Sequence, residues 1–316
     1  MMDYDVIVPI YKMKTDFLDR CLQSIADQTH TEWKCFISDG TPEDWEDYEE
    51  MMDIVNKYVE QDSKKFIYLR QSGKGVSQAR NEAISLGCAP YVAFLDGDDY
   101  WYPTHLEWLT ETIEESDDHV VIWWDCSDIV IQFPMSSGEV HTMQRIASFF
   151  DDADKCRQDL GHTYYYFMGH PPMTSNVIVT RERFEAVDGF DEELQMAEDT
   201  DCWMRMVGDP RKVDTTYGFG QLAAAGGWHE IGPHQTISGG QQTSAAEGGD
   251  PLAVFQEQVT RIIVPRHPRP TIEDKPEGVS DEYWFWLVES TGGIGRSRML
   301  VGNTPYNEID DRKSWL

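Results

Sequence analysis

The first third of the chain alternates short apolar runs with segments of helical spacing, and this alternation constrains the fold more than any other feature. Runs rich in β-branched and aromatic residues predict strands at residues 5–10, 33–38, 66–70 and 91–95. Apolar residues three or four positions apart predict helices at residues 17–28, 46–59 and 76–86. Strands separated by helices of about 10 to 15 residues pair in parallel through right-handed crossovers. We therefore predict an α/β fold with a mostly parallel central sheet flanked by helices.

The rest of the chain continues this pattern less regularly. Helices are predicted at residues 105–115, 181–186 and 198–207, and strands at residues 120–124 and 176–180. Glycine, alanine and glutamine dominate residues 218–249, which we expect to form mobile loops. The proline-rich tail carries the aromatic sequence YWFW at residues 283–286. Two interpretations of the tail stay open, packing back onto the domain and docking of a partner.

The composition is strongly acidic, with 57 Asp and Glu against 26 Lys and Arg and a formal net charge of −31. Such a surface repels phosphate backbones and anionic lipid head groups, which argues against a nucleic-acid binder or a polybasic membrane-surface protein. A nucleotide ligand is still compatible, because a metal ion and a few cations can offset the field locally. We attribute the acidity to solubility in a salty setting.

The sequence shows no targeting or membrane segment. No run approaches the roughly 18 apolar residues of a membrane helix, and the start MMDYDVIVPIYK lacks a basic flank followed by a long apolar stretch. The six cysteines are scattered without a C-x-x-C pair, so neither a zinc site nor a disulfide framework is indicated. We expect a cytoplasmic protein with reduced thiols.

The run FLDGDDYW places three carboxylates directly after an apolar strand, namely Asp96, Asp98 and Asp99. In a parallel sheet, ligands bind beyond the carboxyl ends of the strands, where residues 9–11 and 38–40 are also expected. Two carboxylates two positions apart can reach one divalent cation, and oxygen ligands suit Mg²⁺ or Mn²⁺. A solvated Asp-Gly turn is the plain alternative. The apolar YVAFL before the run and YWYP after it favour a site.

Four ordered motifs over residues 4–109 carry a resemblance to a known family: VIVPIY, LDRCLQSIADQTHTEWKCFISDGT, GKGVSQARNEAI and YVAFLDGDDYWYPTHLEWL. Together they resemble the nucleotide-sugar-binding half of a family 2 type glycosyltransferase of the GT-A fold. The resemblance implies a Rossmann-like sheet, a nucleotide-sugar donor, a UDP-sugar first of all, and a divalent cation, Mn²⁺ or Mg²⁺.

The resemblance also assigns roles in the donor site. It implies that Asp39 contacts the uracil edge and that Pro9 and Tyr11 pack around the base. It implies that Asp98 binds the metal ion that bridges the diphosphate, with Asp96 near the ribose and the metal. Physical chemistry supports the metal role, because a cation held by carboxylates stabilises a diphosphate leaving group without proton transfer.

Three further residues belong to the predicted donor site. Gly97 lies between the two aspartates, and Lys74 and Arg80 flank the glycine-rich turn, where a cation could meet phosphate. We favour Arg80 over Lys74, and either could instead be a solvated surface residue. The sequence departs from the family pattern at Ser38, where Asp often stands, and at Lys12, where Asn is frequent. These departures leave the nucleotide's base open.

The stretch GFDEELQMAEDTDCWMRM resembles the acceptor-side motif of the same family. The resemblance places Asp199 in the role of general base, with Glu198 as the second candidate. An inverting transfer needs one carboxylate to take the proton of the acceptor hydroxyl as this attacks the anomeric carbon. The plain alternative is that Glu198, Asp199 and Asp201 complement the positive end of a helix.

The stretch GGWHEIGPHQTISGG is similar to a family segment whose histidine closes over the diphosphate and completes the metal shell. His234 matches best and His229 is the alternative. A solvated histidine in a glycine-rich loop is the plain interpretation. Glycines on both sides would permit a lid that orders when the donor binds.

The predicted organisation is one GT-A domain with an appendage. Residues 1–110 form the donor-binding half, residues 111–245 the acceptor-binding and catalytic half, and residues 246–316 a proline- and aromatic-rich C-terminal extension. Processive relatives carry Q-x-x-R-W, whereas the segment starting at Gln258 and Arg261 lacks the Trp.

We therefore expect a metal-dependent inverting glycosyltransferase of the hexosyltransferase type that adds a single sugar to a glycan or other hydroxyl acceptor. A nucleotidyltransferase acting on a sugar phosphate and a non-catalytic sugar-binding module are the alternatives. A nucleotidyltransferase would show a glycine-rich basic loop after the first strand, and residues 11–14, YKMK, are not one.

Overall fold

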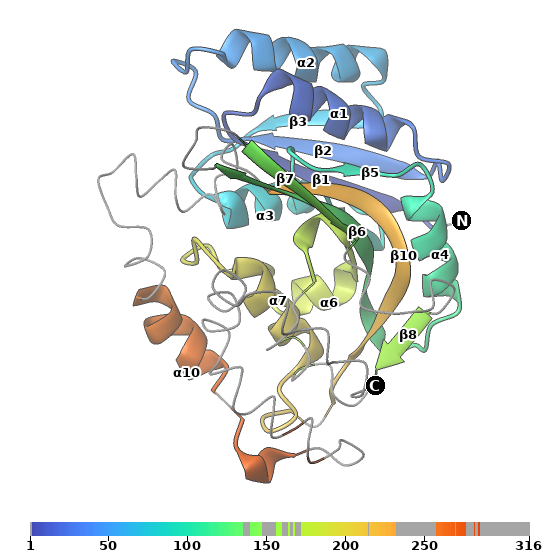
Figure 1. Ribbon diagram of the computed structural model, residues 1–316, viewed down its shortest axis with the longest axis vertical. Helices are drawn as coiled ribbons and strands as arrows, with labels where there is room; N and C mark the ends of the chain where they lie inside the picture. The colour runs from blue at the N-terminus through green and yellow to red at the C-terminus, as the bar shows by residue number, and fades with distance from the viewer. Residues whose placement is uncertain are drawn as a thin grey trace.

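A computed structural model gives the fold of the chain (Figure 1). It describes residues 2–134, 140–146, 156–159, 164, 167, 172–213, 215–231, 257–268, 270–275, 281 and 284.

The first half alternates strands and helices, as the periodicity predicts. The strands are β1 (Tyr4–Ile10), β2 (Trp33–Asp39), β3 (Phe66–Arg70) and β4 (Tyr91–Phe94). The helices between them are α1 (Thr15–Ala26), α2 (Tyr48–Gln61) and α3 (Val76–Leu86). The four strands pair in parallel in the order β3-β2-β1-β4. The predicted parallel sheet is confirmed for this half.

The second half extends the same sheet with mixed strand directions. Its elements up to the last strand are β5 (Tyr100–Trp101), α4 (His105–Glu114), β6 (Val120–Pro134), β7 (Val140–Ile146), β8 (Cys156–Asp159), η1 (Thr174–Asn176), β9 (Val177–Thr180), α6 (Arg181–Ala186), α7 (Glu198–Val207) and β10 (Gly218–Ile231). The order continues as β4-β9-β6-β10-β5, with β9 antiparallel to both of its neighbours and β6 parallel to β10. Strands β7 and β8 pair antiparallel with β6 and β10.

The sequence-based expectation of mobile loops was wrong for residues 218–231, which form strand β10. Composition alone does not predict this strand, because its pairing with β6, β8 and β5 decides its conformation. Gly220 shows what glycine does here: an added Cβ would lie 2.4 Å from Cδ1 of Trp123. The missing side chain therefore allows β10 to approach β6 closely.

The two faces of the sheet carry separate layers of helices (Figure 1). Val6 and Val8 of β1 belong to the buried cluster that includes Leu22 of α1, whereas Ile7 belongs to the cluster that includes Ala83 of α3. This split follows from the period of two in a strand. In the second cluster, the ring of Phe94 lies 5.4 Å from that of Trp203 in α7. Burial of aromatic surface thus fixes α7 beneath the end of β4.

The described part of the C-terminal extension packs onto the domain, as one of the two interpretations of the tail expects. It contains η2 (Val259–Ile263), α10 (Val264–Arg266) and η3 (Ile272–Asp274). Ile263 and Trp284 are buried in the same apolar cluster as Trp203. Gln258 accepts a hydrogen bond from the backbone N–H of Gln195 at 3.0 Å.

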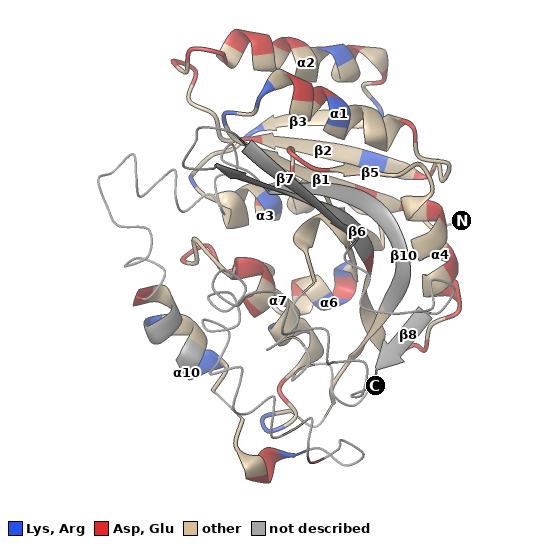
Figure 2. Ribbon diagram, in the orientation of Figure 1, with Lys and Arg blue, Asp and Glu red and all other residues tan. Residues whose placement is uncertain are grey.

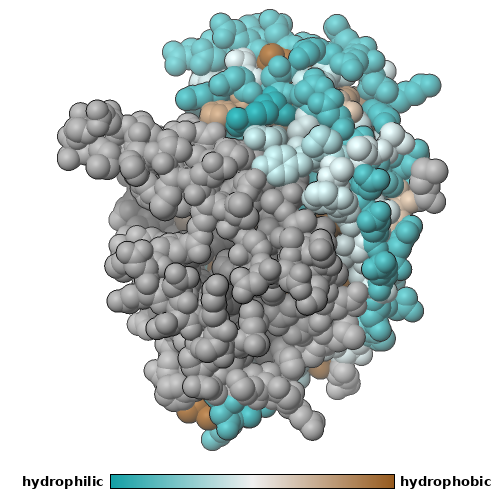
Figure 3. Space-filling view, turned by 45° about the vertical axis from the view of Figure 1, so that its right-hand side comes forward, coloured by the Kyte–Doolittle hydropathy of each residue, from teal (hydrophilic) through white to brown (hydrophobic). Residues whose placement is uncertain are grey.

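On the face that Figure 3 shows, the described residues are largely hydrophilic. Acidic residues are prominent along α2 and α4 in the ribbon of Figure 2. Leu86, Val213 and Ile272 are the large apolar side chains that the described surface exposes. Among the helices described, none combines the length and apolar character needed to cross a bilayer.

Candidate active site

The polar ends of the parallel strands meet at one edge of the sheet, as the sequence predicts. The backbone N–H of Gly40, after β2, donates to the carbonyl of Ile10 in β1 at 3.0 Å. The backbone N–H of Lys12 donates to Oγ1 of Thr41 at 2.8 Å. Gly97, after β4, lies so close to β1 that an added Cβ would be 3.1 Å from Cγ2 of Ile10. Three sequence-distant turns therefore form one surface.

Asp39 is fully buried at this edge, and both of its carboxylate oxygens accept hydrogen bonds. Oδ1 accepts from the backbone N–H of Thr41 at 2.7 Å, and Oδ2 accepts from the Tyr68 hydroxyl at 3.0 Å and from Nη1 of Arg70 at 2.7 Å. Burial disfavours the charged form of Arg70, but the charge of Asp39 outweighs burial, so the pKa of Arg70 is raised. Our sequence analysis missed Tyr68 and Arg70. The register of β3 pairs Arg70 with Asp39 and Tyr68 with Ile37, and the alternation of a strand places Tyr68 and Arg70 on one face.

The three carboxylates of the acidic run have different surroundings. Asp96 and Asp98 are half-buried and Asp99 is buried. The Ser175 hydroxyl donates to Oδ2 of Asp99 at 2.5 Å and accepts from the backbone N–H of Asp96 at 3.2 Å. Burial raises the pKa of the Cys21 thiol beneath the run, and the nearby charges of the three aspartates raise it further. The run is therefore an ordered acidic turn in contact with the core.

Arg80 of α3 joins the two acidic motifs, which lie far apart in the sequence. Its side chain is 3% exposed, and it donates from Nη2 to Oδ1 of Asp96 at 2.7 Å and from Nη1 to Oε1 of Glu198 at 2.9 Å. Its guanidinium carbon lies 5.3 Å from the centre of the Phe190 ring. Burial opposes its charge, yet the charges of Asp96 and Glu198 raise the pKa of Arg80. The phosphate contact expected of Arg80 stays a prediction, as does that of Lys74, which is exposed before α3.

The predicted base, Asp199, begins α7 together with Glu198, and both side chains are buried. Oδ2 of Asp199 accepts from the hydroxyl of Thr174 at 3.0 Å. Oδ1 accepts from the backbone N–H of Thr200 at 2.6 Å. The first turn of α7 carries three carboxylates, Glu198, Asp199 and Asp201, which complement the helix dipole as the plain interpretation holds. Contacts with Arg80 and Thr174 also hold Glu198 and Asp199 at the acidic end of the sheet.

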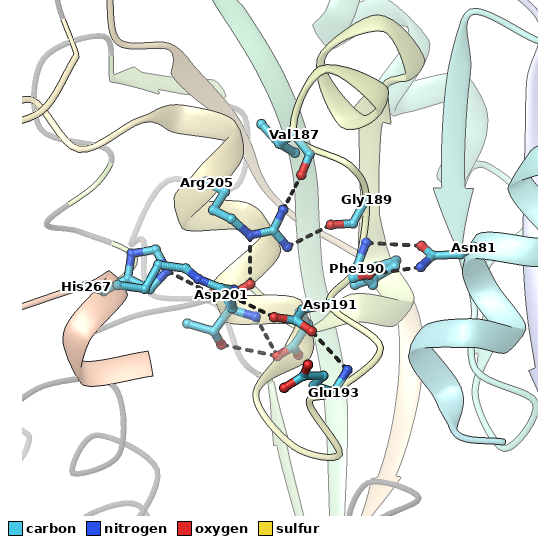
Figure 4. A network of polar contacts seen from close by, with 12 residues as sticks. Asn81, Val187, Gly189, Phe190, Asp191, Glu193, Asp201, Arg205 and His267 are labelled. Carbon is cyan, nitrogen blue, oxygen red and sulfur yellow. Dashed lines mark hydrogen bonds and ion pairs between the residues drawn. The ribbon is translucent and has the colours of Figure 1, made fainter. Parts of the chain in front are cut away.

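The third acidic residue of α7, Asp201, faces the C-terminal extension instead (Figure 4). It is fully buried and accepts from Nε of Arg205 at 2.8 Å, from Nη1 of Arg266 at 2.7 Å and from Nε2 of His267 at 3.0 Å. Burial raises the pKa of Asp201, but the hydrogen bond from His267 and the charge of Arg205 outweigh it and lower the pKa to about 2. Arg266 also pairs with Asp191 at 2.7 Å. Asp201 therefore connects α7 to the C-terminal extension.

A second cluster of buried polar side chains, His105, Asp125 and Asn176, lies next to the acidic run, and the sequence motifs did not indicate it. Nδ1 of His105 lies 2.6 Å from Oδ2 of Asp125, whose Oδ1 accepts a hydrogen bond from Asn176. The His105 ring stacks on Trp101 at 4.3 Å between centroids. Trp101 donates from Nε1 to the carbonyl of Ser175 at 2.6 Å. No motif links these residues, so only the fold reveals them.

Two predicted histidines cannot be placed at the site. His234 lies outside the described residues, and His229 is described only by its backbone, which pairs with Ile129 in the ladder between β10 and β6. Within the described part of the chain, no three His, Cys, Asp or Glu side chains gather in a group that could hold a metal ion. Asp96 and Asp98 are half-buried after β4, and Mg²⁺ commonly uses one or two protein carboxylates together with substrate phosphates.

The central sheet and its flanking helices form the α/β fold that the sequence predicts. Residues 5–169, slightly more than half of the chain, match the family described as Glycosyl transferase family 2. The chain belongs to this family.

Similar proteins span several microorganisms. TuaG of Bacillus subtilis is 32% identical over 110 residues, which cover 35% of this chain and 41% of TuaG. The uncharacterized glycosyltransferase MJ1057 of Methanocaldococcus jannaschii is 24% identical over 213 residues, covering 66% of each chain. The chain thus spans less than half the length of TuaG.

Among solved structures, residues 1–349 of TarS from S. aureus in complex with UDP-GlcNAc share the fold. The TM-score is 0.57 at 16% identity, and the match covers 98% of this chain and 78% of TarS 1–349.

Proposed function

We propose that this protein is a metal-dependent, inverting glycosyltransferase that moves one sugar from a UDP-sugar to a hydroxyl acceptor. One observation carries the proposal: the buried guanidinium of Arg80 contacts both Asp96, after β4, and Glu198, which precedes Asp199 at the start of α7. The acidic turn expected to hold the donor diphosphate therefore lies beside the carboxylate expected to accept a proton. An inverting transfer needs both groups around one anomeric carbon.

The nucleobase of the donor, uracil in a UDP-sugar, would lie at the edge of the sheet where Pro9, Tyr11 and Asp39 come together. Asp39 is fully buried and its carboxylate is held by Thr41, Tyr68 and Arg70, so a contact with the uracil imide N–H would need the turn at Gly40 to move aside. The bound UDP-GlcNAc in the TarS structure supports a UDP-sugar as the class of donor. Lys74, on its exposed turn, and His234 would complete the diphosphate site.

Asp98 would hold the divalent cation, with Asp96 beside it. Bound there, Mn²⁺ or Mg²⁺ would stabilise the negative charge that develops on the departing diphosphate. Arg80 holds one oxygen of Asp96, so the orientation of this carboxylate is set before the donor binds.

Asp199 would act as the base of the transfer. The acceptor hydroxyl oxygen forms a bond to the anomeric carbon while the bond from that carbon to the diphosphate oxygen breaks on the opposite face. The hydroxyl proton passes to the carboxylate of Asp199, and the nucleoside diphosphate leaves with the bonding electrons. The acceptor would be a glycan or another molecule with a free hydroxyl.

The test measures release of nucleoside diphosphate from a panel of nucleotide sugars, with and without Mn²⁺ and with candidate hydroxyl acceptors. We expect metal-dependent release from a UDP-sugar, and a kcat for Asp199→Asn lower by about 10² to 10⁴-fold with donor KM little changed. The matched control is Asp16→Asn, which changes an exposed aspartate in α1. Two results would contradict the mechanism: release of nucleoside diphosphate at the same rate with and without Mn²⁺, or full activity of Asp199→Asn.

The same preparation separates the two alternatives. A nucleotidyltransferase would release pyrophosphate from a nucleoside triphosphate in the presence of a sugar phosphate. A non-catalytic sugar-binding module would show a thermal shift with a nucleotide sugar but no product.

A further inference from the structure

The turn η1 presents three consecutive side chains to three carboxylates of different elements. Thr174 donates to Asp199 of α7 and Ser175 to Asp99 of the acidic turn, while the third residue, Asn176, donates to Asp125 of β6. All three side chains of η1 belong to buried residues, between 2% and 7% exposed. Buried hydroxyl and amide groups of this kind hold their partners in one geometry, because breaking such a hydrogen bond leaves a polar group unsatisfied.

Thr174 acts on Asp199 from outside the helix that carries it. Thr200 also donates to Asp199, from its backbone and its hydroxyl, but it is the next residue of the same helix. A contact within α7 orients the carboxylate relative to the helix alone. Thr174 instead ties Oδ2 to the segment that leads into β9, on the side of the central sheet.

Ser175, next to Thr174, ties the same turn to the donor side. Its hydroxyl accepts from the backbone N–H of Asp96 at 3.2 Å, and its carbonyl accepts from Nε1 of Trp101 at 2.6 Å. The turn therefore sets the separation between the acidic turn and Asp199. In a transfer reaction this separation matters, since a displacement of about 1 Å can lower the rate about 10²-fold.

We infer that Thr174 is a positioning residue for transfer, which holds the Asp199 carboxylate at a set distance from the donor site. The inference rests on the proposed function, because it takes Asp199 as the base. It predicts that substitutions at two adjacent residues of η1 change different kinetic parameters. Loss of the Thr174 hydroxyl would lower kcat, whereas loss of the Ser175 hydroxyl would disturb the acidic turn and raise the donor KM.

The test compares two variants. Thr174→Val keeps the shape of the side chain and removes the hydroxyl that donates the hydrogen bond, whereas Thr174→Ser keeps the hydroxyl. We expect kcat to fall about tenfold in Thr174→Val, with donor KM within about twofold of wild type, and Thr174→Ser to recover most of the rate. Ser175→Ala is the neighbouring control and is expected to raise donor KM more than it lowers kcat. Equal kcat in Thr174→Val and wild type, or no recovery in Thr174→Ser, would overturn the inference.

A double variant tests the coupling directly. Once the base is gone there is nothing for Thr174 to position, so Asp199→Asn with Thr174→Val should have the same residual kcat as Asp199→Asn alone. A further tenfold loss in the double variant would show that Thr174 acts elsewhere. Full activity of Asp199→Asn would instead refute the base assignment itself. If Thr174→Val does not fold, Thr174→Cys, a weaker donor, replaces it, and a kcat as high as that of Thr174→Ser would overturn the inference.

Discussion

At the residue scale, carboxylates that look alike in the sequence differ in what holds them. Asp39 is buried with a cation, a hydroxyl and a backbone N–H as donors. Asp96 is 34% exposed and shares Arg80 with Glu198. A buried arginine between two carboxylates matters for stability, because removing it takes a counter-ion from the buried Glu198 and from the partly exposed Asp96.

We therefore predict that Arg80→Met lowers the free energy of unfolding by about 3 kcal/mol, because Asp96 and Glu198 lose the buried guanidinium that lies between them. Urea unfolding at neutral pH measures this. Lys57→Met is the matched control, since Lys57 pairs with Asp19 at the surface, with side chains 48% and 41% exposed. The control is expected to cost under about 1 kcal/mol. A role for Arg80 in phosphate binding alone would leave both variants equally stable.

At the scale of elements, helix α7 serves two surfaces. Its first two residues, Glu198 and Asp199, face the acidic end of the sheet, and Asp201 faces the C-terminal extension (Figure 4). His267 donates from Nε2 to Asp201, and its Nδ1 lies 3.1 Å from the Tyr164 hydroxyl oxygen, which can donate to it when the ring is neutral. Burial lowers the pKa of His267 in spite of the nearby Asp201, consistent with this form. The extension therefore holds the helix that carries the proposed base.

This arrangement predicts a pH dependence of stability. The pKa of Asp201 falls from 3.8 to about 2 on folding, so its ionised form stabilises the fold above pH 3.8, and this contribution is lost as the pH falls through about 2. The contribution is about 2 kcal/mol at neutral pH. We expect the stability difference between wild type and Asp201→Asn to be smaller at pH 3 than at pH 7 by about 1 kcal/mol, measured by urea unfolding.

The control for this prediction is Asp281→Asn. Asp281 pairs with Lys275, but its side chain is 93% exposed, so its replacement should change the same difference much less. A pH-independent difference for Asp201→Asn would mean that the carboxylate is not held in its ionised form by Arg205, Arg266 and His267.

At the scale of the whole molecule, the net charge of −31 sets a repulsion that no single ion pair offsets. Added salt shortens the Debye length from about 10 Å at 0.1 M to about 3 Å at 1 M, which screens this repulsion. We predict that Tm rises by about 5 °C between 0.05 and 1 M KCl, measured by circular dichroism.

A variant with fewer charges separates screening from other effects of salt. Asp53 and Glu60 are both exposed on α2, and Asp53→Asn with Glu60→Gln should raise Tm at low salt and reduce its slope with KCl. A Tm that falls as KCl increases would show that ion pairs outweigh the general repulsion.

Much of the fold follows from local sequence. The strands at residues 66–70 and 91–95, and the helix at residues 76–86, were predicted to within one residue, because apolar periodicity reports burial directly. Strand β10 was missed, since its stability lies in its pairing with distant strands and not in its own glycine-rich composition.

The sequence by itself determined the family, the parallel half of the sheet and the acidic turn that follows β4, because these depend on short-range patterns and ordered motifs. Only the tertiary structure decided which carboxylate meets which partner. Arg80 reaches Asp96 and Glu198, and Thr174 reaches Asp199, across separations in the chain that no local pattern records. The reason is physical: periodicity reports which face of an element is buried, whereas a hydrogen bond depends on how whole elements pack.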